Sequence, residues 1–273
     1  MAIVTISREL AALGDETAHE LSTLLKYRFI DKRVLEERVK SYGEVGHKLQ
    51  KYDERKPLFL ASLSQDRDDY LHYLKTAMLA EVGSGSCVVI GRGAHVMFRN
   101  MPGVLSVFLV APFEIRVERV KSYFHCDDRR ARQIIEQSDK DREGFHHYFF
   151  DIDWRQSGNY HLTLNTGHLR PTVCAEIIKY VRDELISVEA ETQNDTRLKE
   201  LSLGQQVKHY ILYEKEVPIH FLETAVTQGV VTLYGVANSQ SLVEAALTTA
   251  RDAFPACSMQ SEIQVVQDYS VMP

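Results

Sequence analysis

Short apolar runs alternate with amphipathic segments along the first 187 residues of the chain. Runs that are apolar at nearly every position predict strands covered on both faces, whereas apolar residues recurring every three or four positions predict helices. The predicted strands cover residues 2–6, 29–30, 87–90, 104–110 and 162–165, and the predicted helices cover 15–26, 57–82 and 172–187. Strands that alternate with helices indicate an α/β domain with a parallel sheet flanked by helices.

One further helix is predicted after the strand over residues 104–110. Pro112 suits the first turn of a helix, because its missing N–H has no partner there in any case. Phe113, Val117, Val120 and Phe124 then recur at helical spacing and form one apolar stripe.

The last part of the chain has a different pattern. Residues 203–213 and 240–253 read as helices, the second capped by Ser239, and residues 219–225, 230–236 and 263–266 read as strands. Gly229 suits a hairpin turn between the first two strands. The polar stretch before this unit is the best candidate for a linker. We therefore expect an α/β domain over residues 1–187, a linker over 188–202 and a small α+β domain over 203–273.

The composition of the chain argues against several classes of protein. The chain has 273 residues and a formal net charge of −6, which excludes a protein whose main task is to coat nucleic acid. No apolar run approaches the roughly 20 residues that span a bilayer, and the N-terminus does not read as a signal peptide. The four cysteines are scattered without a CxxC pair, so no zinc or redox motif is indicated and we predict no metal ligands. A cytoplasmic location is expected.

The loop after the first strand is the first candidate site. In a parallel sheet such a loop presents backbone N–H groups and the positive end of a helix dipole to ligands. The strict phosphate-loop motif is absent, since Glu9 stands at its first glycine and Asp15 follows Gly14 where lysine belongs. Acidic residues in the first helical turn would repel a triphosphate, although Arg8 could supply positive charge. On the motif alone we favour Asp15 as an N-cap in a tight connection.

A resemblance to a known family emerges from segments that occur in one order. They are residues 3–9 (IVTISRE), 27–32 (YRFIDK), 89–94 (VIGRGA), 107–112 (VFLVAP), 139–142 (DKDR) and 164–167 (LNTG). Together they resemble the cytidylate kinase-like family of P-loop nucleoside monophosphate kinases, over roughly residues 1–187. The resemblance implies a P-loop fold, a site for a nucleotide or other small phosphorylated ligand, a mobile lid, and ATP and Mg²⁺ as cofactors if the protein is active.

The resemblance also implies roles for individual residues. The phosphate-binding residues of the donor site are expected to be Ser7, Arg8, Gly14 and Thr17. Arg92 matches the arginine that holds the acceptor monophosphate. Asp139 and Arg142 match a catalytic acid and arginine at the lid, the arginine near the transferred phosphate. An ordinary i,i+3 helix pair is an equal alternative for those two.

The chain departs from the family at two places. Ala11, Ala12 and Leu13 stand where glycine and serine are expected, and a positive φ there would be strained, most of all at Leu13. Gly93 stands where cytidylate kinases carry an aspartate beside the cytosine nucleotide, so specificity for cytosine does not carry over.

The C-terminal part resembles a BON domain, on the segment over residues 229–235 (GVVTLYG) followed by the amphipathic helix over 242–253. Such domains are thought to bind lipids or other ligands. Residues 200–273 hold three basic and eight acidic residues, which disfavours docking to anionic lipid and favours a small ligand or a protein partner. The alternative is that this part only packs on the first domain.

Two functions remain open at this point. The first is Mg-ATP-dependent phosphoryl transfer to a nucleoside monophosphate or similar small acceptor, favoured by Arg92, Asp139 and Arg142. The second is a catalytically inactive, kinase-like regulatory or ligand-binding protein that uses its BON-like domain. The absent lysine, the absent glycines and the acids at Asp15 and Glu16 favour the second.

Overall fold

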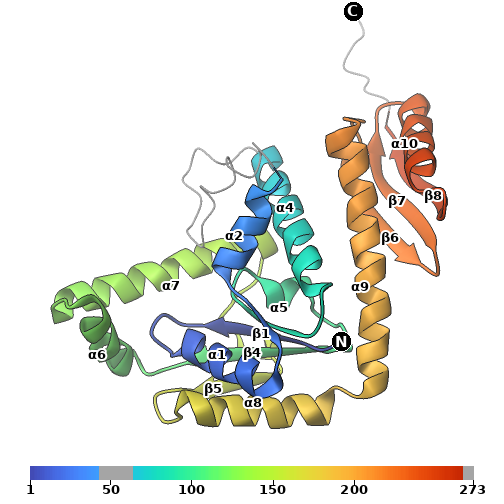
Figure 1. Cartoon of the computed structure of the whole chain (residues 1–273). Helices are drawn as coiled ribbons and strands as arrows, with labels where there is room; N and C mark the ends of the chain where they lie inside the picture. Colours follow the sequence, from blue (N-terminus) through green and yellow to red (C-terminus); the bar gives the residue numbers. More distant parts are fainter. Residues whose placement is uncertain (43–63, 267–273) are drawn as a thin grey trace, which may run out of the picture. The chain divides into compact units, whose positions relative to one another are not determined.

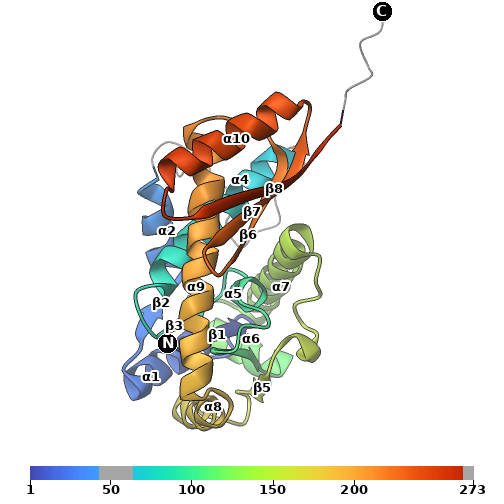
Figure 2. The ribbon, with the colours of Figure 1, turned by 90° about the vertical axis from the view of Figure 1, so that its right-hand side faces the viewer.

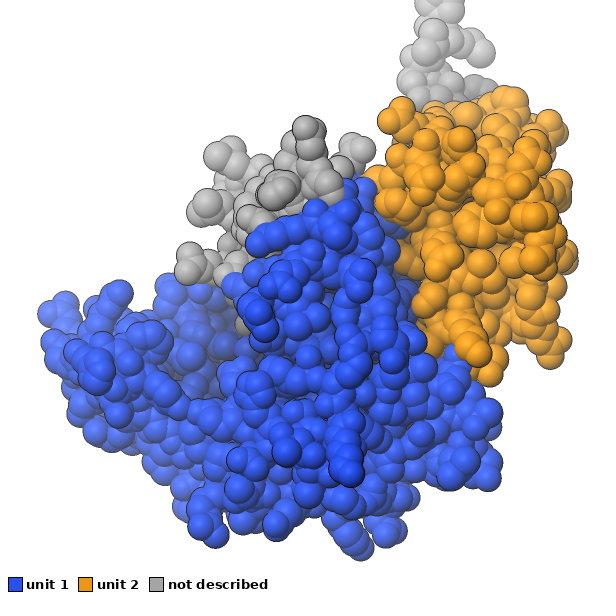
Figure 3. All heavy atoms as spheres, in the orientation of Figure 1, with its two compact units in different colours: residues 1–195 blue, residues 196–273 orange. Residues whose placement is uncertain are grey.

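The computed structural model describes residues 1–42 and 64–266 (Figure 1). The chain divides into two compact units, Met1–Asp195 and Thr196–Pro273 (Figure 3). The boundary falls within helix α9 (Val188–His209), so the polar stretch interpreted as a linker is part of a long helix. No helix among the described residues is both long enough and apolar enough to span a membrane.

Unit 1 is built on a five-stranded parallel sheet with strand order β2-β3-β1-β4-β5. The strands are β1 (Ile3–Arg8), β2 (Arg28–Ile30), β3 (Cys87–Ile90), β4 (Val104–Val110) and β5 (Leu162–Asn165). The two central neighbours of β1 hold it in register, with Ile3 opposite both Cys87 and Val104. Every position of β3 is buried, which explains its continuous apolar sequence. The predicted parallel α/β architecture is therefore confirmed.

Helices cover both faces of this sheet (Figure 1). They are α1 (Gly14–Leu25), α2 (Lys32–Lys40), α4 (Ser64–Val82), α5 (Ala94–Met97), α6 (Phe113–Phe124), α7 (Asp128–Phe150) and α8 (Pro171–Leu185). Helices α1 and α8 pack against one face through a core that includes Val4, Ile6, Leu21 and Ile178. Helices α6 and α7 pack on each other as a hairpin around Val117, Val120 and Ile135. This hairpin is the segment that the resemblance implied as a lid.

Three elements differ in detail from the sequence predictions, and one is the last strand, which was expected over residues 263–266 and is present as β8 over Ser258–Val265. The residue that caps α1 is Leu13 in the left-handed conformation, with no side-chain cap, and Asp15 lies inside the first turn. The interpretation of Asp15 as an N-cap was therefore wrong. The helix predicted over residues 57–82 is present from Ser64 onward as α4, and residues 57–63 lie outside the described part of the chain.

Unit 2 contains a three-stranded sheet of order β6-β7-β8 with α10 lying across one face (Figure 2). Its elements are β6 (His220–Thr227), β7 (Val230–Ala237), α10 (Gln240–Ala253) and β8 (Ser258–Val265), after the π-helical turn η3 (Tyr210–Glu214). Gln228 and Gly229 both have positive φ and form the predicted hairpin turn. Ser239 caps α10 through the N–H of Leu242, as predicted. These observations establish a small α+β unit.

An ion-pair network around one buried carboxylate joins α2 and β2 to α4. The Glu81 carboxylate, which is 5% exposed, accepts hydrogen bonds of 2.7 Å from both Arg28 Nη2 and Arg38 Nε. Burial by itself would raise the pKa of Glu81, but the hydrogen bonds and charges of the two arginines outweigh burial and lower the pKa.

Replacing Glu81 by glutamine is expected to lower the free energy of unfolding by about 1–2 kcal/mol at neutral pH. Because the folded-state pKa lies below the ordinary value of 4.5, this stabilisation is fully present above pH 4.5. It is lost as the pH falls through the lower, folded-state value. Urea unfolding at pH 7 and pH 3 measures the difference between the two proteins. A difference that grows towards pH 3 would contradict the assignment.

Candidate functional site

The loop between β1 and α1 adopts a strained backbone. Ala11 and Leu13 have φ values of 61° and 52°, so two residues with side chains occupy the left-handed region. Each such residue costs roughly 1–2 kcal/mol relative to a right-handed conformation. The sequence expectation that the departures from glycine would be strained is confirmed at these two positions.

The N–H groups of this loop remain available to a ligand. The N–H of Ala12 donates to Glu9 O at 3.2 Å, and that of Thr17 donates to Leu13 O at 3.0 Å. Within the described residues, no protein acceptor is found for the backbone N–H groups of Leu10, Ala11, Leu13 and Gly14. These groups lie at the positive end of the α1 dipole. This combination is the usual basis for binding an anion.

Two arginines of α6 hold the loop's carbonyl groups. Arg116 Nε donates to Leu10 O at 2.8 Å, and Arg119 Nη1 donates to Ala11 O at 2.9 Å. Arg119 Nη2 also donates to Thr166 O at 2.7 Å, which ties the loop to the segment after β5. No local pattern singles out the two arginines of this clamp, because both lie among eight basic residues between positions 116 and 142.

The predicted phosphate-binding residues are arranged unequally around the loop. Ser7 is buried, and its Oγ lies 3.1 Å from His95 Nδ1. Burial lowers the pKa of His95 to about 3, so this imidazole is neutral at physiological pH. Thr17 is fully buried and donates its hydroxyl to Leu13 O at 2.7 Å, which makes it part of the loop's internal support.

Gly14 is the one remaining glycine of the loop. A Cβ atom there would come within 2.5 Å of Arg8 Cγ, so the absence of a side chain lets Arg8 pack across the start of α1. Glycine is required at this position by close approach rather than by φ.

The two acidic residues expected in the first turn of the helix after the loop are found there. Asp15 and Glu16 both belong to the first turn of α1, and the Glu16 carboxylate accepts a hydrogen bond from the Tyr123 hydroxyl. The negative charge of Glu16 is therefore directed towards the end of α6.

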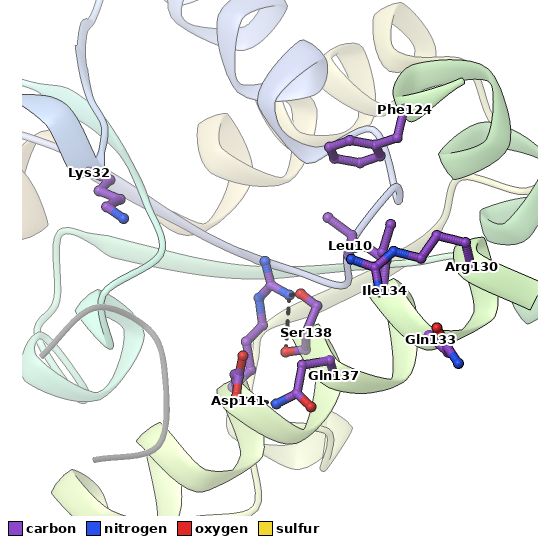
Figure 4. Close-up of a pocket in the computed structure, with 10 residues that line it drawn as sticks. Leu10, Lys32, Phe124, Arg130, Gln133, Ile134, Gln137, Ser138 and Asp141 are labelled. Carbon is purple, nitrogen blue, oxygen red and sulfur yellow. Dashed lines mark hydrogen bonds between the residues drawn. The ribbon is translucent and has the colours of Figure 1, made fainter. Parts of the chain in front are cut away.

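A pocket with a volume of about 410 Å³ opens beside the loop (Figure 4). One face of α7 supplies most of its wall, Leu10 contributes from the loop, and Lys32 approaches from the start of α2. The lining residues are Leu10, Lys32, Phe124, Arg130, Gln133, Ile134, Gln137, Ser138, Asp141 and Arg142. Three cations against one carboxylate make this lining positive in a chain whose net charge is −6, which favours an anionic ligand.

The structure separates the two predicted lid residues. Arg142 lines the pocket, and its Nη1 donates to the Ser138 hydroxyl one turn earlier on α7. Asp139 is buried and pairs with Arg116 Nη2 at 2.7 Å and with Arg155 Nη2 at 2.8 Å. Among the described residues, the ion pairs of Asp139 thus lead to other elements rather than to Arg142.

Arg92 lies in the loop that follows β3. It has a φ of 57°, is 4% exposed, and donates to Glu36 Oε1 at 2.9 Å and to the Tyr70 hydroxyl at 3.3 Å. Glu36 therefore stands where the resemblance expects an acceptor phosphate. The neighbouring Gly93 has a φ of 71°, and a Cβ atom there would lie 2.4 Å from the Phe150 ring. An aspartate at this position would be strained at this φ and would overlap the Phe150 ring unless the ring moved.

The buried histidine and aromatic residues behind the loop act as packing groups. His146 stacks on Trp154, and Tyr160 stacks on both His95 and Phe108. No group of three or more His, Cys, Asp or Glu residues that could hold a metal ion exists among the described residues. Mg²⁺ characteristically binds through nucleotide phosphates with one or two carboxylates, and Asp15 is an exposed carboxylate in the first turn of α1.

Replacing Ala11 by glycine is expected to raise the free energy of unfolding by about 0.5–1 kcal/mol, because glycine adopts a positive φ without strain. Ala12→Gly is the matched control. Ala12 is fully buried and has an ordinary φ, so its replacement is expected to destabilise by about 1 kcal/mol. Urea denaturation of both variants gives the comparison. Destabilisation of equal size at both positions would contradict the observed loop conformation.

This chain is similar in sequence or in structure to several known proteins. The chain is 35% identical over 83 residues to a cytidylate kinase of Sulfolobus acidocaldarius, a match that spans 30% of this chain and 44% of that protein. A crystal structure of an uncharacterized protein from Eubacterium ventriosum superposes with a TM-score of 0.52 at 18% identity, covering 67% of this chain and 99% of the other. Residues 3–168 match the cytidylate kinase-like family. The chain belongs to the cytidylate kinase-like family.

Proposed function

We propose that this protein is a cytoplasmic phosphotransferase that moves the terminal phosphoryl group of Mg-ATP to a nucleoside monophosphate or a similar small phosphorylated acceptor. The proposal rests mainly on Leu10, because this residue belongs both to the loop and to the lining of the pocket. The loop around it presents N–H groups without protein acceptors, and the same residue lines a pocket whose charged groups are mostly cations. Both features suit bound phosphate.

The residues then take complementary roles. Ser7, Arg8 and the backbone of the loop around Gly14 hold the donor phosphates, with Thr17 supporting the loop from behind. Arg92 holds the acceptor phosphate after the Glu36 carboxylate has moved away from the Arg92 guanidinium. Arg142 lies on the pocket wall, where its guanidinium stabilises charge on the transferred group. Little covalent work is left to the protein, since phosphoryl transfer is catalysed mainly by positioning and charge stabilisation.

A second function is supported by specific observations. Asp15 and Glu16 place negative charge in the first turn of α1, and Arg92 is already paired with Glu36. Both features weaken phosphate binding. They fit a catalytically inactive protein of the same fold that binds a ligand for regulation, with the BON-like domain over residues 203–273 as its module for a small ligand or a protein partner. The helix α10 and the hairpin of β6 and β7 support that resemblance.

One experiment separates the two functions. The purified protein is incubated with Mg-ATP and each nucleoside monophosphate in turn, ADP release is followed, and the unfolding temperature is measured with and without ATP. Turnover above the rate without acceptor supports the phosphotransferase. Stabilisation by ATP without turnover supports the inactive binder. Neither signal, in the presence of a kinase that responds as a positive control, would overturn the proposal.

A further inference from the structure

An ion-pair network with a buried centre joins the phosphate loop to the lid hairpin. It consists of Glu9 on the loop, Arg116 on α6, Asp139 on α7 and Arg155 after α7, and we call it the Arg116 network. Arg116 is 3% exposed and Asp139 is 8% exposed. The pairs Arg116–Glu9, Arg116–Asp139 and Arg155–Asp139 have N–O distances of 3.2, 2.7 and 2.8 Å. Two acids and two arginines leave the network without net charge.

Arg116 contacts the loop and the lid at the same time. Its Nε donates to Leu10 O at 2.8 Å, Nη1 pairs with Glu9 Oε1, and Nη2 donates to Asp139 Oδ1. The guanidinium is a rigid plane, so a shift of Asp139 on α7 displaces the group that fixes the carbonyl of Leu10. The orientation of that carbonyl determines where the next N–H in the loop points, because the peptide unit is planar.

Glu9 anchors the other side of the network. Its second carboxylate oxygen accepts the N–H of Ala111 at 3.1 Å, immediately after β4. The loop is thereby held to the sheet at Glu9 and to the lid through Arg116. Arg119 also links α6 to the loop, through Ala11 O, but Arg116 is the arginine that in addition contacts Asp139 on α7.

We propose that Arg116 and Asp139 are positioning residues that couple the lid to the phosphate loop, so that the placement of α7 sets the geometry of the loop's N–H groups. This inference rests on the proposed function for its consequence in nucleotide binding. It replaces the role of catalytic acid expected for Asp139, because both carboxylate oxygens of Asp139 are bound to arginines and the residue does not line the pocket.

The same hairpin provides a matched control. Arg132 on α7 pairs with Glu114 on α6 at 2.7 Å, in an exposed position with no contact to the loop. Glu114→Gln therefore weakens a link between the same two helices without touching the network. Asp139→Asn removes charge from the network at nearly constant shape, and Arg116→Lys keeps the charge but cannot reach three partners at once.

Amide hydrogen exchange of the full chain without ligand tests the coupling. In Asp139→Asn and Arg116→Lys, the N–H groups of Glu9 and Ala12, which donate to Leu109 O and Glu9 O, are expected to exchange about tenfold faster than in the unmodified protein, because breaking a buried ion pair has effects of at least this size. Exchange in β3 at the centre of the sheet is expected to be unchanged. Glu114→Gln is expected to leave both segments within twofold.

Binding of Mg-ATP, measured by calorimetry, provides the second readout. The two network variants are expected to bind about tenfold more weakly and Glu114→Gln normally. If the unmodified protein binds no ATP, the proposed function fails while the exchange data still decide the coupling. Unchanged exchange in the loop of both variants would overturn the inference. Faster exchange in β3 as well as in the loop would also overturn it, since the network would then be a general stabilising element.

Discussion

Gly93→Asp is expected to lower the free energy of unfolding by about 3 kcal/mol and to leave the protein without any gain in affinity for CMP. Two effects add at this residue. A non-glycine residue at its φ of 71° is strained, and the new Cβ atom would lie 2.4 Å from Phe150 Cε2. The Phe150 ring is half-buried at the end of α7 and contacts the buried Phe145 and Phe149, so a movement of the ring that relieves the overlap disturbs these contacts.

Chemical denaturation and CMP titration of Gly93→Asp check both parts of this expectation. Gly158→Asp is the matched control, since a Cβ atom at Gly158 meets no other atom within 4 Å. Its free energy of unfolding is expected to change by less than about 0.5 kcal/mol. If Gly93→Asp had normal stability and bound CMP tightly, the Phe150 ring would be easily displaced. Steric overlap at this position would then not prevent specificity for cytosine.

Much of the fold follows from the sequence for a simple physical reason. The strands β3 and β4 are predicted with their observed limits, because a strand buried on both faces is apolar at nearly every position and ends where polar residues begin. The limits of β5 are also predicted correctly, although only Leu164 of that strand is buried. The helix after Ser239 is also predicted correctly, because a capping side chain marks its first turn.

Other features depended on tertiary contacts that no local pattern records. The stretch interpreted as a linker is polar on most positions, yet it is helical as part of α9. Leu198 in this stretch is buried, whereas Val188 at its start is exposed. A helix needs only a narrow apolar stripe, so composition alone underestimates it.

In the candidate site, too, features that depend on local sequence were predicted, whereas contacts between distant segments were not. The sequence identified Leu13 as the residue that a positive φ would strain most, and the observed φ of 52° agrees. It placed Arg142 at the lid, and Arg142 lines the pocket beside the loop. It did not identify the partners of Arg116 and Arg119, because their contacts with Leu10 and Ala11 join residues more than 100 positions apart.

The clamp by these arginines gives a physical account of a loop that has lost its glycines. Glycine lets a phosphate loop adopt positive φ without cost. In this chain the hydrogen bonds from Arg116 and Arg119 to the carbonyls of Leu10 and Ala11 stabilise the same kind of backbone from outside. Each charge-assisted hydrogen bond contributes roughly 1.5–3 kcal/mol, which is enough to offset a strained residue. A loop without the glycine motif can therefore keep its N–H groups directed towards a ligand.

Arg142→Ala is expected to reduce kcat for phosphoryl transfer about 1,000-fold, with a much smaller change in KM. An arginine that stabilises charge mainly in the transition state affects kcat, and known examples contribute factors of about 10³–10⁵. Arg142→Lys is expected to recover only a small part of the loss, because an ammonium group cannot present two parallel N–H donors to phosphate oxygens.

The measurement is steady-state ADP release with the acceptor that supports the fastest turnover. Lys140→Ala is the matched control, because it removes an exposed cation two residues away on α7 that does not line the pocket. Its kcat is expected to stay within twofold of the unmodified protein. If Arg142→Ala and Lys140→Ala behaved alike, the pocket beside Leu10 would not be where the phosphoryl group is transferred. The transfer would then be expected to take place near Arg92 and its partner Glu36.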